Sequence, residues 1–225
     1  LAGVEAVAAA VRDGHGPGVD VAEGLEEDRL ALHHGNGRGG AKIADWVNEQ
    51  CNGKANVAII EGLPSDYTTQ RMGGFVDRCA EVYPAIVLVA SQPGDWVREK
   101  GMNAAMDMIQ AHPEINVIYG LSDEMALGAV QACKQLNRDD IICVGLDGNS
   151  NAFESVKAGE LTATLDCGPV AIGANAIKAV AEAIDGVARE EKVIEAETTV
   201  VDLTLVVLAG RKTSRIPGQL IRLGI

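Results

Sequence analysis

Aromatic residues are scarce in this chain of 225 residues, at 3% of the composition, whereas 47% of it is hydrophobic. The core must therefore consist mainly of Ala, Val, Leu and Ile, which is typical of α/β proteins whose buried parallel strands read as aliphatic runs. Where rings are few, one outside the core is informative. Trp96 stands at the mouth of a loop, between a hydrophobic run and an expected helix, and is therefore a candidate binding residue.

The chain also has no excess of positive charge and no long apolar run. The net charge is −13, which repels phosphate backbones, so binding to nucleic acid is not expected. No stretch approaches the ~20 apolar residues that a helix needs to cross a bilayer. No signal peptide is visible, but the chain opens without an initiator Met, so this absence does not indicate a compartment.

Residues that often carry catalysis or metal binding lack the required spacing. The five cysteines form no CxxC pair and have no histidine at zinc-ligand spacing. Their odd number argues against a disulfide framework, and Cys79, Cys133 and Cys143 are predicted to be small buried hydrophobes. No histidine accompanies a nucleophile, and GxSxG, HExxH and Walker motifs are absent. The sequence therefore predicts no enzyme activity, catalytic residue, metal or cofactor.

Strand-like and helix-like segments alternate through the middle of the chain. Strands are expected at 56–62, 85–92, 115–121, 141–147 and 161–167, and helices at 67–82, 95–111, from Asp123 onward and at 149–158. The short loops between them favour right-handed βαβ units and an α/β fold with a doubly wound parallel sheet.

The flanking segments are less regular. An Ala-rich helix is expected over 3–12, a Gly-rich charged stretch over 14–40 and an amphipathic helix over 39–51. Residues 169–186 predict a helix that starts with Pro and ends with Gly, with an apolar stripe formed by Ile177, Val180, Ala181 and Ile184. Residues 198–210 predict a strand pair or one long strand. The tail that follows carries basic residues and no acidic one, which indicates a foreign or disordered appendage.

A dinucleotide-binding motif can be read at residues 35–40. "GNGRGG" fits GxGxxG, and Glu61 follows about twenty residues later, as the ribose-binding carboxylate of that motif would. The preceding stretch "DRLALHH" is short and half polar, however, whereas a first Rossmann strand is buried on both faces. A chance match in a chain with 26 glycines is the preferred interpretation.

Polar side chains gather where the expected strands end. In open α/β sheets, ligands bind beyond the carboxyl ends of the strands. Carboxylates accept sugar hydroxyls, Arg donates to them and a flat ring stacks on the apolar face of a sugar, so the set favours a neutral polyhydroxylated ligand. Its members, strand by strand, are Ser65, Asp66, Thr69 and Arg71; Gln92, Asp95 and Trp96; Ser122 and Asp123; Asp147 and Asn149; Asp166 and Cys167.

Each of these residues also has a purely structural interpretation. Ser122 and Asp123 could cap the following helix. Asp147, which precedes Gly148, could be a turn residue. Trp96 could pack on its own helix, and Arg71 could pair with a neighbouring carboxylate on the surface.

Several segments resemble a known family. "ASQPGDWVREKG", "SDEMALGA", "VGLDGN", "AGELTATL" and "VDLTLVV" are similar, in order and spacing, to segments of the periplasmic sugar-binding subunits of ABC importers, ribose-binding proteins included. The resemblance is strong from about residue 56 to 208 and weaker back to residue 3. It implies the periplasmic-binding-protein type 1 fold, in which two α/β lobes are joined by three crossing strands and clamp a sugar between them.

The resemblance also implies a division of the chain. Residues 1–34 and 168–201 would form a partial first lobe, 35–167 and 202–208 a complete second lobe, and 209–225 would lie outside the family pattern. Roughly two βα units of the first lobe would be missing. The second lobe is therefore expected to fold and the first to be poorly formed.

Site residues follow from the resemblance in the same way. Trp96 matches the ring that stacks on the sugar, and Asp147 matches a carboxylate that takes two hydroxyls. Thr69 stands where ribose binders carry a ligand Arg, for which Arg71 could substitute. Elsewhere the chain departs from the ribose binders, so another sugar or a polyol is plausible: Ser122 replaces an Asn, Cys167 replaces a Gln, and Ala22 and Glu23 replace an Asp–Arg pair.

The sequence thus predicts a substrate-binding protein that delivers a monosaccharide to the membrane permease of an ABC importer. It would be periplasmic and monomeric, and would act by hinge closure around the ligand. The alternative is the effector domain of a LacI-type transcription regulator, which shares the fold but needs a basic helix-turn-helix. An NAD-dependent enzyme is a distant third hypothesis.

Overall fold

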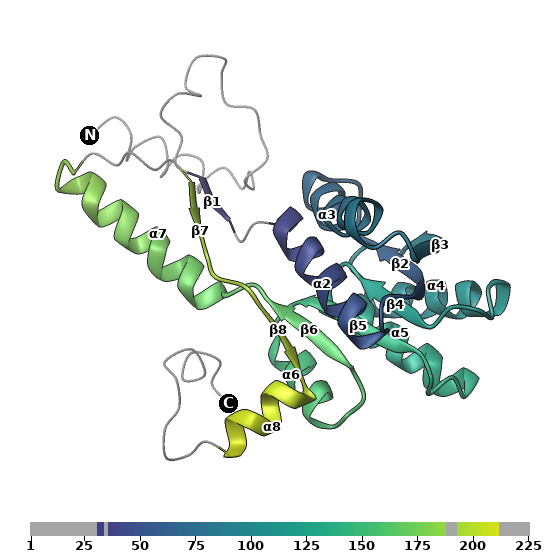
Figure 1. Cartoon of the computed structure of the whole chain (residues 1–225). Helices are drawn as coiled ribbons and strands as arrows, with labels where there is room; N and C mark the ends of the chain where they lie inside the picture. Colours follow the sequence, from purple (N-terminus) through teal and green to yellow (C-terminus); the bar gives the residue numbers. More distant parts are fainter. Residues whose placement is uncertain (1–30, 34–35, 188–192, 212–225) are drawn as a thin grey trace.

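The computed structural model describes residues 31–33, 36–187 and 193–211 (Figure 1). In chain order the elements are β1 (Ala31–His33), α2 (Asn36–Gln50), β2 (Ala55–Glu61), α3 (Asp66–Val82), β3 (Ile86–Pro93), α4 (Arg98–Ala111), β4 (Val117–Gly120), α5 (Asp123–Leu136), β5 (Ile142–Asp147), α6 (Ser150–Lys157), β6 (Ala163–Asp166), α7 (Pro169–Ile184), β7 (Val193–Glu195), β8 (Thr199–Asp202) and α8 (Leu203–Arg211). The helix expected over 3–12, residues Ala22 and Glu23, and the tail beyond residue 211 lie outside the described residues.

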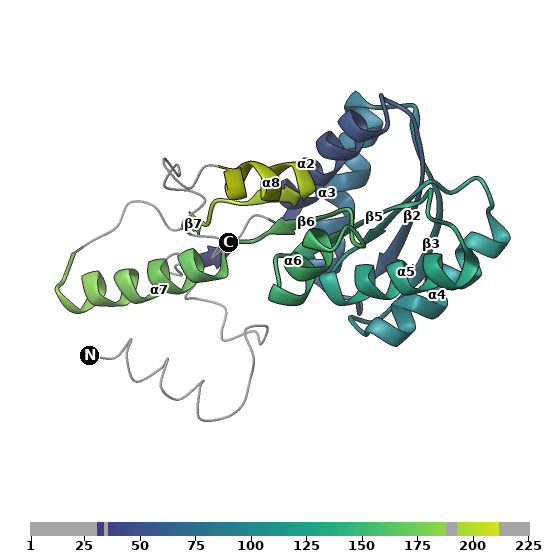
Figure 2. The same ribbon diagram turned by 90° about the horizontal axis from the view of Figure 1, so that it is seen from below.

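Most of the described chain belongs to one six-stranded sheet and the helices that pack on it. Its strand order is β3-β2-β4-β5-β6-β8, and all neighbouring pairs are parallel except β6 and β8, which are antiparallel. Helices α2 and α3 cover one face, and α4, α5 and α6 cover the other (Figure 2). We call this sheet with α2–α6 and α8 the six-stranded unit. The predicted doubly wound α/β fold is confirmed, with an antiparallel edge strand in place of a wholly parallel sheet.

The core of the six-stranded unit is largely aliphatic, as the composition predicts. All four residues of β4 are buried, because this strand lies in the middle of the sheet with helices on both faces. Phe75 of α3 packs on Tyr119 of β4, with ring centroids 5.3 Å apart. Cys79, Cys133 and Cys143 are buried, which confirms their prediction as small core residues.

The glycines of the "GNGRGG" motif serve helix packing. Gly37 and Gly40 lie inside α2, not in a loop between a strand and a helix. A Cβ at Gly40 would come within 2.3 Å of the Arg71 carbonyl oxygen, and a Cβ at Gly74 of α3 would come within 1.9 Å of the Gly37 carbonyl oxygen. These glycines let the two helix backbones touch, so the dinucleotide interpretation is wrong.

A second, smaller part of the chain lies apart from this sheet. Strands β1 and β7 form a parallel two-stranded sheet beside α7 (Figure 1); we call these three elements the two-stranded unit. The helix expected over 169–186 is present, but its apolar stripe is not buried. Ile177 is 75% exposed, Val180 59% and Ile184 69%.

The segment expected to be a strand pair or one long strand changes structure at Asp202. Strand β8 ends there and α8 begins at the next residue. The Asp202 carboxylate accepts hydrogen bonds from the Leu205 N–H (2.9 Å) and from the Trp46 indole (3.1 Å). The first bond satisfies a free N–H at the helix start, and the second ties α2 to β8. The prediction of a strand beyond residue 202 is therefore wrong.

Candidate functional site

A hollow of about 600 Å³ opens at the carboxyl ends of β2, β3, β4 and β5. This volume lies within the range of about 300–1,000 Å³ that is typical of small-molecule sites. Charged, hydroxyl-bearing and apolar side chains share its lining, which consists of Leu63, Pro64, Ser65, Tyr67, Arg71, Trp96, Ser122, Glu124 and Asp147. The hollow thus lies at the strand ends, where the sequence analysis expects a ligand to bind.

Arg71 lies at the centre of this site. It comes from the second turn of α3 and is only 7% exposed. Its guanidinium donates to the Leu121 carbonyl oxygen (2.6 Å) and pairs with the Asp147 carboxylate (2.9 Å). Its central carbon also lies 5.6 Å from the Trp96 ring centroid, within the range of cation–π contacts. Arg71 does pair with a carboxylate, but in the hollow and not on the outer surface.

Trp96 is held by an unusual loop and not by a helix. Helix α4 begins at Arg98, three residues later than expected at its amino end, and residues 94–97 form a turn. Asp95 and Trp96 have φ angles of 52° and 64°, in the left-handed region that costs a residue with a Cβ about 1–2 kcal/mol. The indole lies against Gly62, where a Cβ would come within 1.9 Å of the ring. Trp96 is thus part of the cavity wall, in contact with the Gly62 backbone and near the Arg71 guanidinium.

Asp147 ends β5 and is positioned by its neighbours. Burial raises the pKa of its carboxyl group, and the charge of Arg71 opposes that shift. One carboxylate oxygen faces Arg71, and the other lies 3.4 Å from the Asp123 N–H at the start of α5. Its φ of 147° is outside the common range, and Gly148 follows at 80°. Asp147 is therefore the last residue of β5, and its carboxylate lines the hollow.

Asp123 lies behind the cavity and joins the loops that form it. It has no exposed surface, and its carboxylate accepts bonds from the Asn149 N–H (2.7 Å) and the Thr164 hydroxyl (2.5 Å). Burial raises its pKa to about 7, although these hydrogen bonds oppose the shift. The side chain thus connects α5 with the loop after β5 and with β6. Asp123 does lie in the first turn of α5, as the capping interpretation requires. That interpretation does not account for the hydrogen bonds from its carboxylate to the loop after β5 and to β6.

The remaining predicted site residues lie in different places. Ser122 both lines the hollow and caps α5, where its hydroxyl accepts from the Met125 N–H at 3.4 Å. Thr69 is exposed and bonds the Ser65 carbonyl oxygen, away from the lining, so Arg71 rather than Thr69 enters the site. Cys167 is buried outside the lining, and burial raises its thiol pKa to about 12. Glu23 lies outside the described residues.

Four lining residues do not belong to the predicted site. Leu63, Pro64 and Tyr67 come from the loop after β2 and the start of α3, and Glu124 comes from the first turn of α5. The hydrogen bond from Arg98 lowers the pKa of Glu124. Tyr67 had a sequence signal: it lies four residues before Arg71, which places both on one face of a helix.

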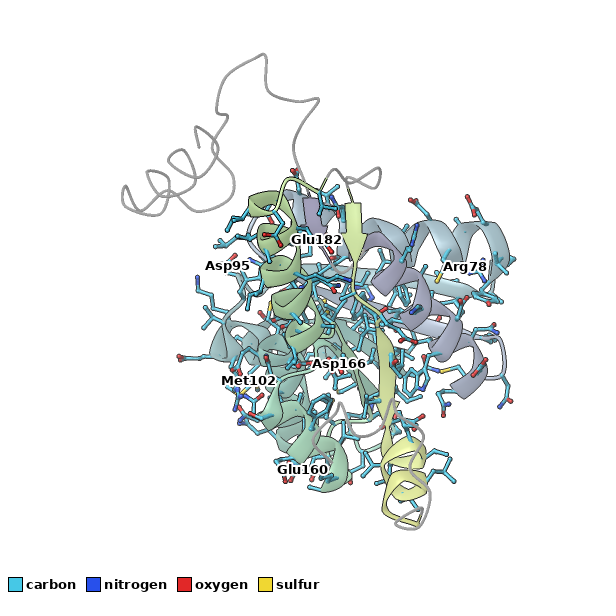
Figure 3. All side chains as sticks on the ribbon, turned by 90° about the vertical axis from the view of Figure 1, so that its left-hand side faces the viewer. Arg78, Asp95, Met102, Glu160, Asp166 and Glu182 are labelled. Atoms are coloured by element: carbon cyan, nitrogen blue, oxygen red, sulfur yellow. The ribbon has the colours of Figure 1, made fainter. Side chains whose placement is uncertain are left out.

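Two other residues predicted at the strand ends, Asp95 and Asp166, do not line the cavity. Asp95 pairs with Lys100 at 2.7 Å, and Asp166 accepts from the Gly168 N–H at 2.8 Å (both labelled in Figure 3). Within the described residues, no group of three or more His, Cys, Asp or Glu side chains is placed to hold a metal ion. None of the described helices is long and apolar enough to cross a membrane.

Comparison with known proteins identifies the family. Residues 35–188 match the periplasmic binding protein domain, so this chain belongs to that family. It is 34% identical to the ribose import binding protein RbsB of Escherichia coli (strain K12) over 169 residues, which are 75% of this chain and 55% of that protein. It is also 34% identical to the D-allose-binding periplasmic protein of the same organism over 146 residues, 64% of this chain and 47% of that protein.

A solved structure gives the same result in three dimensions. A periplasmic solute-binding protein of an ABC transporter from Actinobacillus succinogenes 130z, with bound D-allose, has a TM-score of 0.72 and 35% identity. The alignment covers 77% of this chain and 62% of that one. The chain spans about half the length of the curated relatives that it matches. Family and fold are thus established, in agreement with the resemblance noted from the sequence.

Proposed function

We propose that this chain is the sugar-binding component of an ABC-type importer and holds a neutral monosaccharide or polyol in the hollow at the strand ends. The observation that carries the proposal is the convergence of Trp96, Arg71 and Asp147 on one cavity. These groups supply an apolar ring face, a fixed donor and a fixed acceptor. A polyol presents complementary groups, because each hydroxyl both donates and accepts and the C–H face is apolar.

The ion pair between Arg71 and Asp147 prepares both groups for a neutral ligand. Their charges compensate each other inside a partly buried site, so the ligand need not carry a charge. The Asp147 carboxylate has lone pairs for hydroxyl donors, and the Arg71 guanidinium is an N–H donor of the kind that binds hydroxyl oxygens. Glu124 is paired in the same way, with Arg98 at 2.9 Å. Because the positive charge of Arg71 is already matched by Asp147, the lining favours neutral sugars over phosphorylated or acidic compounds.

The ligand need not be ribose. Relatives of comparable identity are named for ribose, D-allose and xylitol. Ser122 has a short hydroxyl where the family resemblance implies an amide, and Tyr67 adds a half-exposed phenol to the lining. These differences change which hydroxyl groups of the ligand can be hydrogen-bonded, but they leave the Trp96 ring available for stacking. The proposed ligand class is therefore pentoses, hexoses and sugar alcohols.

Transport is favoured over the regulator hypothesis by the names of the relatives, which are import or sugar-binding proteins. A periplasmic location, a membrane permease as the partner and a monomeric state belong to this proposal. The six-stranded unit would form one of two lobes. The ligand would favour the closed conformation because it contacts both lobes at once.

A calorimetric screen tests the proposal. D-ribose, D-allose, L-arabinose and xylitol are titrated into the 225-residue chain, and the melting temperature is recorded with each, since binding to the folded state raises it. At least one should bind, and Trp96→Ala and Asp147→Asn should each weaken binding about tenfold or more, the equivalent of about 1.4 kcal/mol. Asp139→Asn, which removes an exposed carboxylate, is the matched control. Equal binding by all three variants would refute the assigned site.

A further inference from the structure

Two buried thiols lie close together, one on α5 and the other on β5. The sulfur atoms of Cys133 and Cys143 lie 3.8 Å apart, in van der Waals contact, and the residues are 6% and 2% exposed. Cys133 belongs to the last turn of α5, and Cys143 is the second residue of β5. The remaining cysteines, Cys51, Cys79 and Cys167, are free thiols in other parts of the six-stranded unit.

We propose that Cys133 and Cys143 are a modification site, which an external disulfide oxidant converts into an internal disulfide. The sulfurs already point toward each other, so bond formation requires an approach of about 1.8 Å, from contact to the ~2.05 Å of a disulfide. The two residues are ten positions apart, separated by the helix end and the turn that leads into β5. The bond would therefore close a short loop and fasten α5 to the sheet.

The chemistry is thiol–disulfide exchange, with a small-molecule disulfide such as oxidised glutathione, or a dithiol–disulfide oxidoreductase, as the oxidant. The Cys133 thiolate attacks the external disulfide, forming a mixed disulfide and releasing one thiol. The Cys143 thiolate then attacks the Cys133 sulfur and expels the second thiol. The protein loses two protons and two electrons, and the oxidant is reduced to two thiols.

The surroundings favour Cys133 as the first nucleophile. The hydrogen bond with the Cys143 thiol lowers the pKa of Cys133, and the positive charge of Arg138 acts in the same direction. The pKa of Cys143 is raised by the same hydrogen bond and by burial. Cys133 is also nearer the surface, so it can meet the oxidant when the end of α5 opens or before it packs.

The disulfide should stabilise the fold without altering the site. Cys133 is eleven residues beyond Ser122, so it lies about 16 Å along α5 from the cavity. Cross-linking restricts the unfolded chain more than the folded one, which raises stability. The inference is independent of the proposed function, since neither sulfur belongs to the cavity lining.

Peptide mass spectrometry tests the inference on the unaltered chain. The protein is refolded with oxidised glutathione, denatured, alkylated with iodoacetamide and digested with trypsin. Cleavage after Lys134 and Arg138 puts the two cysteines on separate peptides, 101–134 and 139–157, each with one cysteine. We expect one cross-linked species, 2 Da lighter than the sum, and alkylation of the three other cysteines. Full alkylation of Cys133 and Cys143 would overturn the proposal.

A melting experiment gives a second readout. The oxidised chain should melt about 5–10 °C above the chain reduced with dithiothreitol. Cys133→Ala and Cys143→Ala should each abolish this difference, whereas Cys79→Ala, an equally buried control, should keep it. A difference that persists in Cys133→Ala and Cys143→Ala would assign it to other thiols and contradict the proposal.

Discussion

The six-stranded and two-stranded units contain helices of similar length that differ sharply in burial. Helix α5 of the first unit buries nine of its 14 residues, whereas Ala179 is the buried residue of the 16-residue α7. Both sequences are apolar and both are helical. The difference shows that an apolar stripe predicts a helix but not its partner. Since packing supplies most of the stability of a helix in a protein, the two units should respond very differently to mutation.

The largest contrast is expected for the same substitution made in each unit. Ile118 is fully buried in β4, so Ile118→Ala should cost about 2–5 kcal/mol through lost transfer energy and a cavity. Ile177 is 75% exposed on α7, so Ile177→Ala should change stability by about 0.5 kcal/mol or less. Urea unfolding followed by circular dichroism measures both. Comparable losses would show that the Ile177 stripe is covered in solution and that the comparison fails.

The next effect tests the contact between α2 and α3. A methyl group at Gly74 would overlap the Gly37 carbonyl oxygen, so Gly74→Ala should destabilise the chain by about 2 kcal/mol or more despite its gain in helix propensity.

The matched control is the preceding residue of the same helix. At Gly73 an added Cβ meets only the Asp77 carboxylate, at 3.9 Å, so Gly73→Ala should stabilise the chain by up to ~1 kcal/mol. Opposite signs for the two variants in the same urea experiment are the expected result. If Gly74→Ala were also stabilising, the helices could not be in backbone contact.

A pH effect on stability is expected from a buried carboxyl group of the six-stranded unit. The pKa of Asp123 is about 7 in the folded chain and about 3.8 when unfolded. Between these values the unfolded chain has released a proton that the folded chain still holds, so the contribution of Asp123 to stability is fully present below pH 4 and is lost as pH rises to 7. The slope from this one group is at most about 1.4 kcal/mol per pH unit.

Replacement of this carboxyl group gives the check. Asp123→Asn cannot ionise, so its stability, measured by urea unfolding from pH 4.5 to pH 8, should fall less steeply than that of the unaltered chain. Asp147 and Asp166, whose pKa values are also raised by burial, would supply the slope that remains. Asp139→Asn controls for net charge and should keep the full slope. An unchanged slope in Asp123→Asn would mean that this carboxyl group is ionised throughout.

The alternating strands and helices could be predicted from the sequence because each hydrophobic pattern had a clear period. The failure at α8 has a physical cause. Residues 203–208 read "LTLVVL", a short apolar run without a period, which fits a buried strand as well as a helix. Asp202 was the available signal, since Asp is a preferred helix N-cap. The exposure of Ile177 does not follow from the apolar pattern of its helix, because such a pattern does not reveal what covers the stripe.

The location of the hollow and part of its lining could be predicted from the sequence, and its role as the binding site stays a prediction. Trp96, Arg71, Ser122 and Asp147 line one cavity because parallel strands end at the same edge. Helix geometry could have shown that Thr69 and Arg71 do not both point into the hollow, since residues two positions apart do not share a helix face. The turn that aims Trp96 was beyond prediction, because two successive non-glycine residues with positive φ are stabilised by tertiary contacts and not by local preference.

The smallest effect asks whether the two units unfold together. Gly173 lies inside α7, and no atom of the described residues lies within 4 Å of an added Cβ, so Gly173→Ala should strengthen that helix by up to ~1 kcal/mol. Both tryptophans, Trp46 and Trp96, lie in the six-stranded unit, so fluorescence reports on that unit alone. Because α7 buries so little, we expect an unchanged urea midpoint by fluorescence and a small gain in helix signal by circular dichroism. A fluorescence midpoint that rises with the full helix gain would instead show that the two units unfold as one cooperative unit.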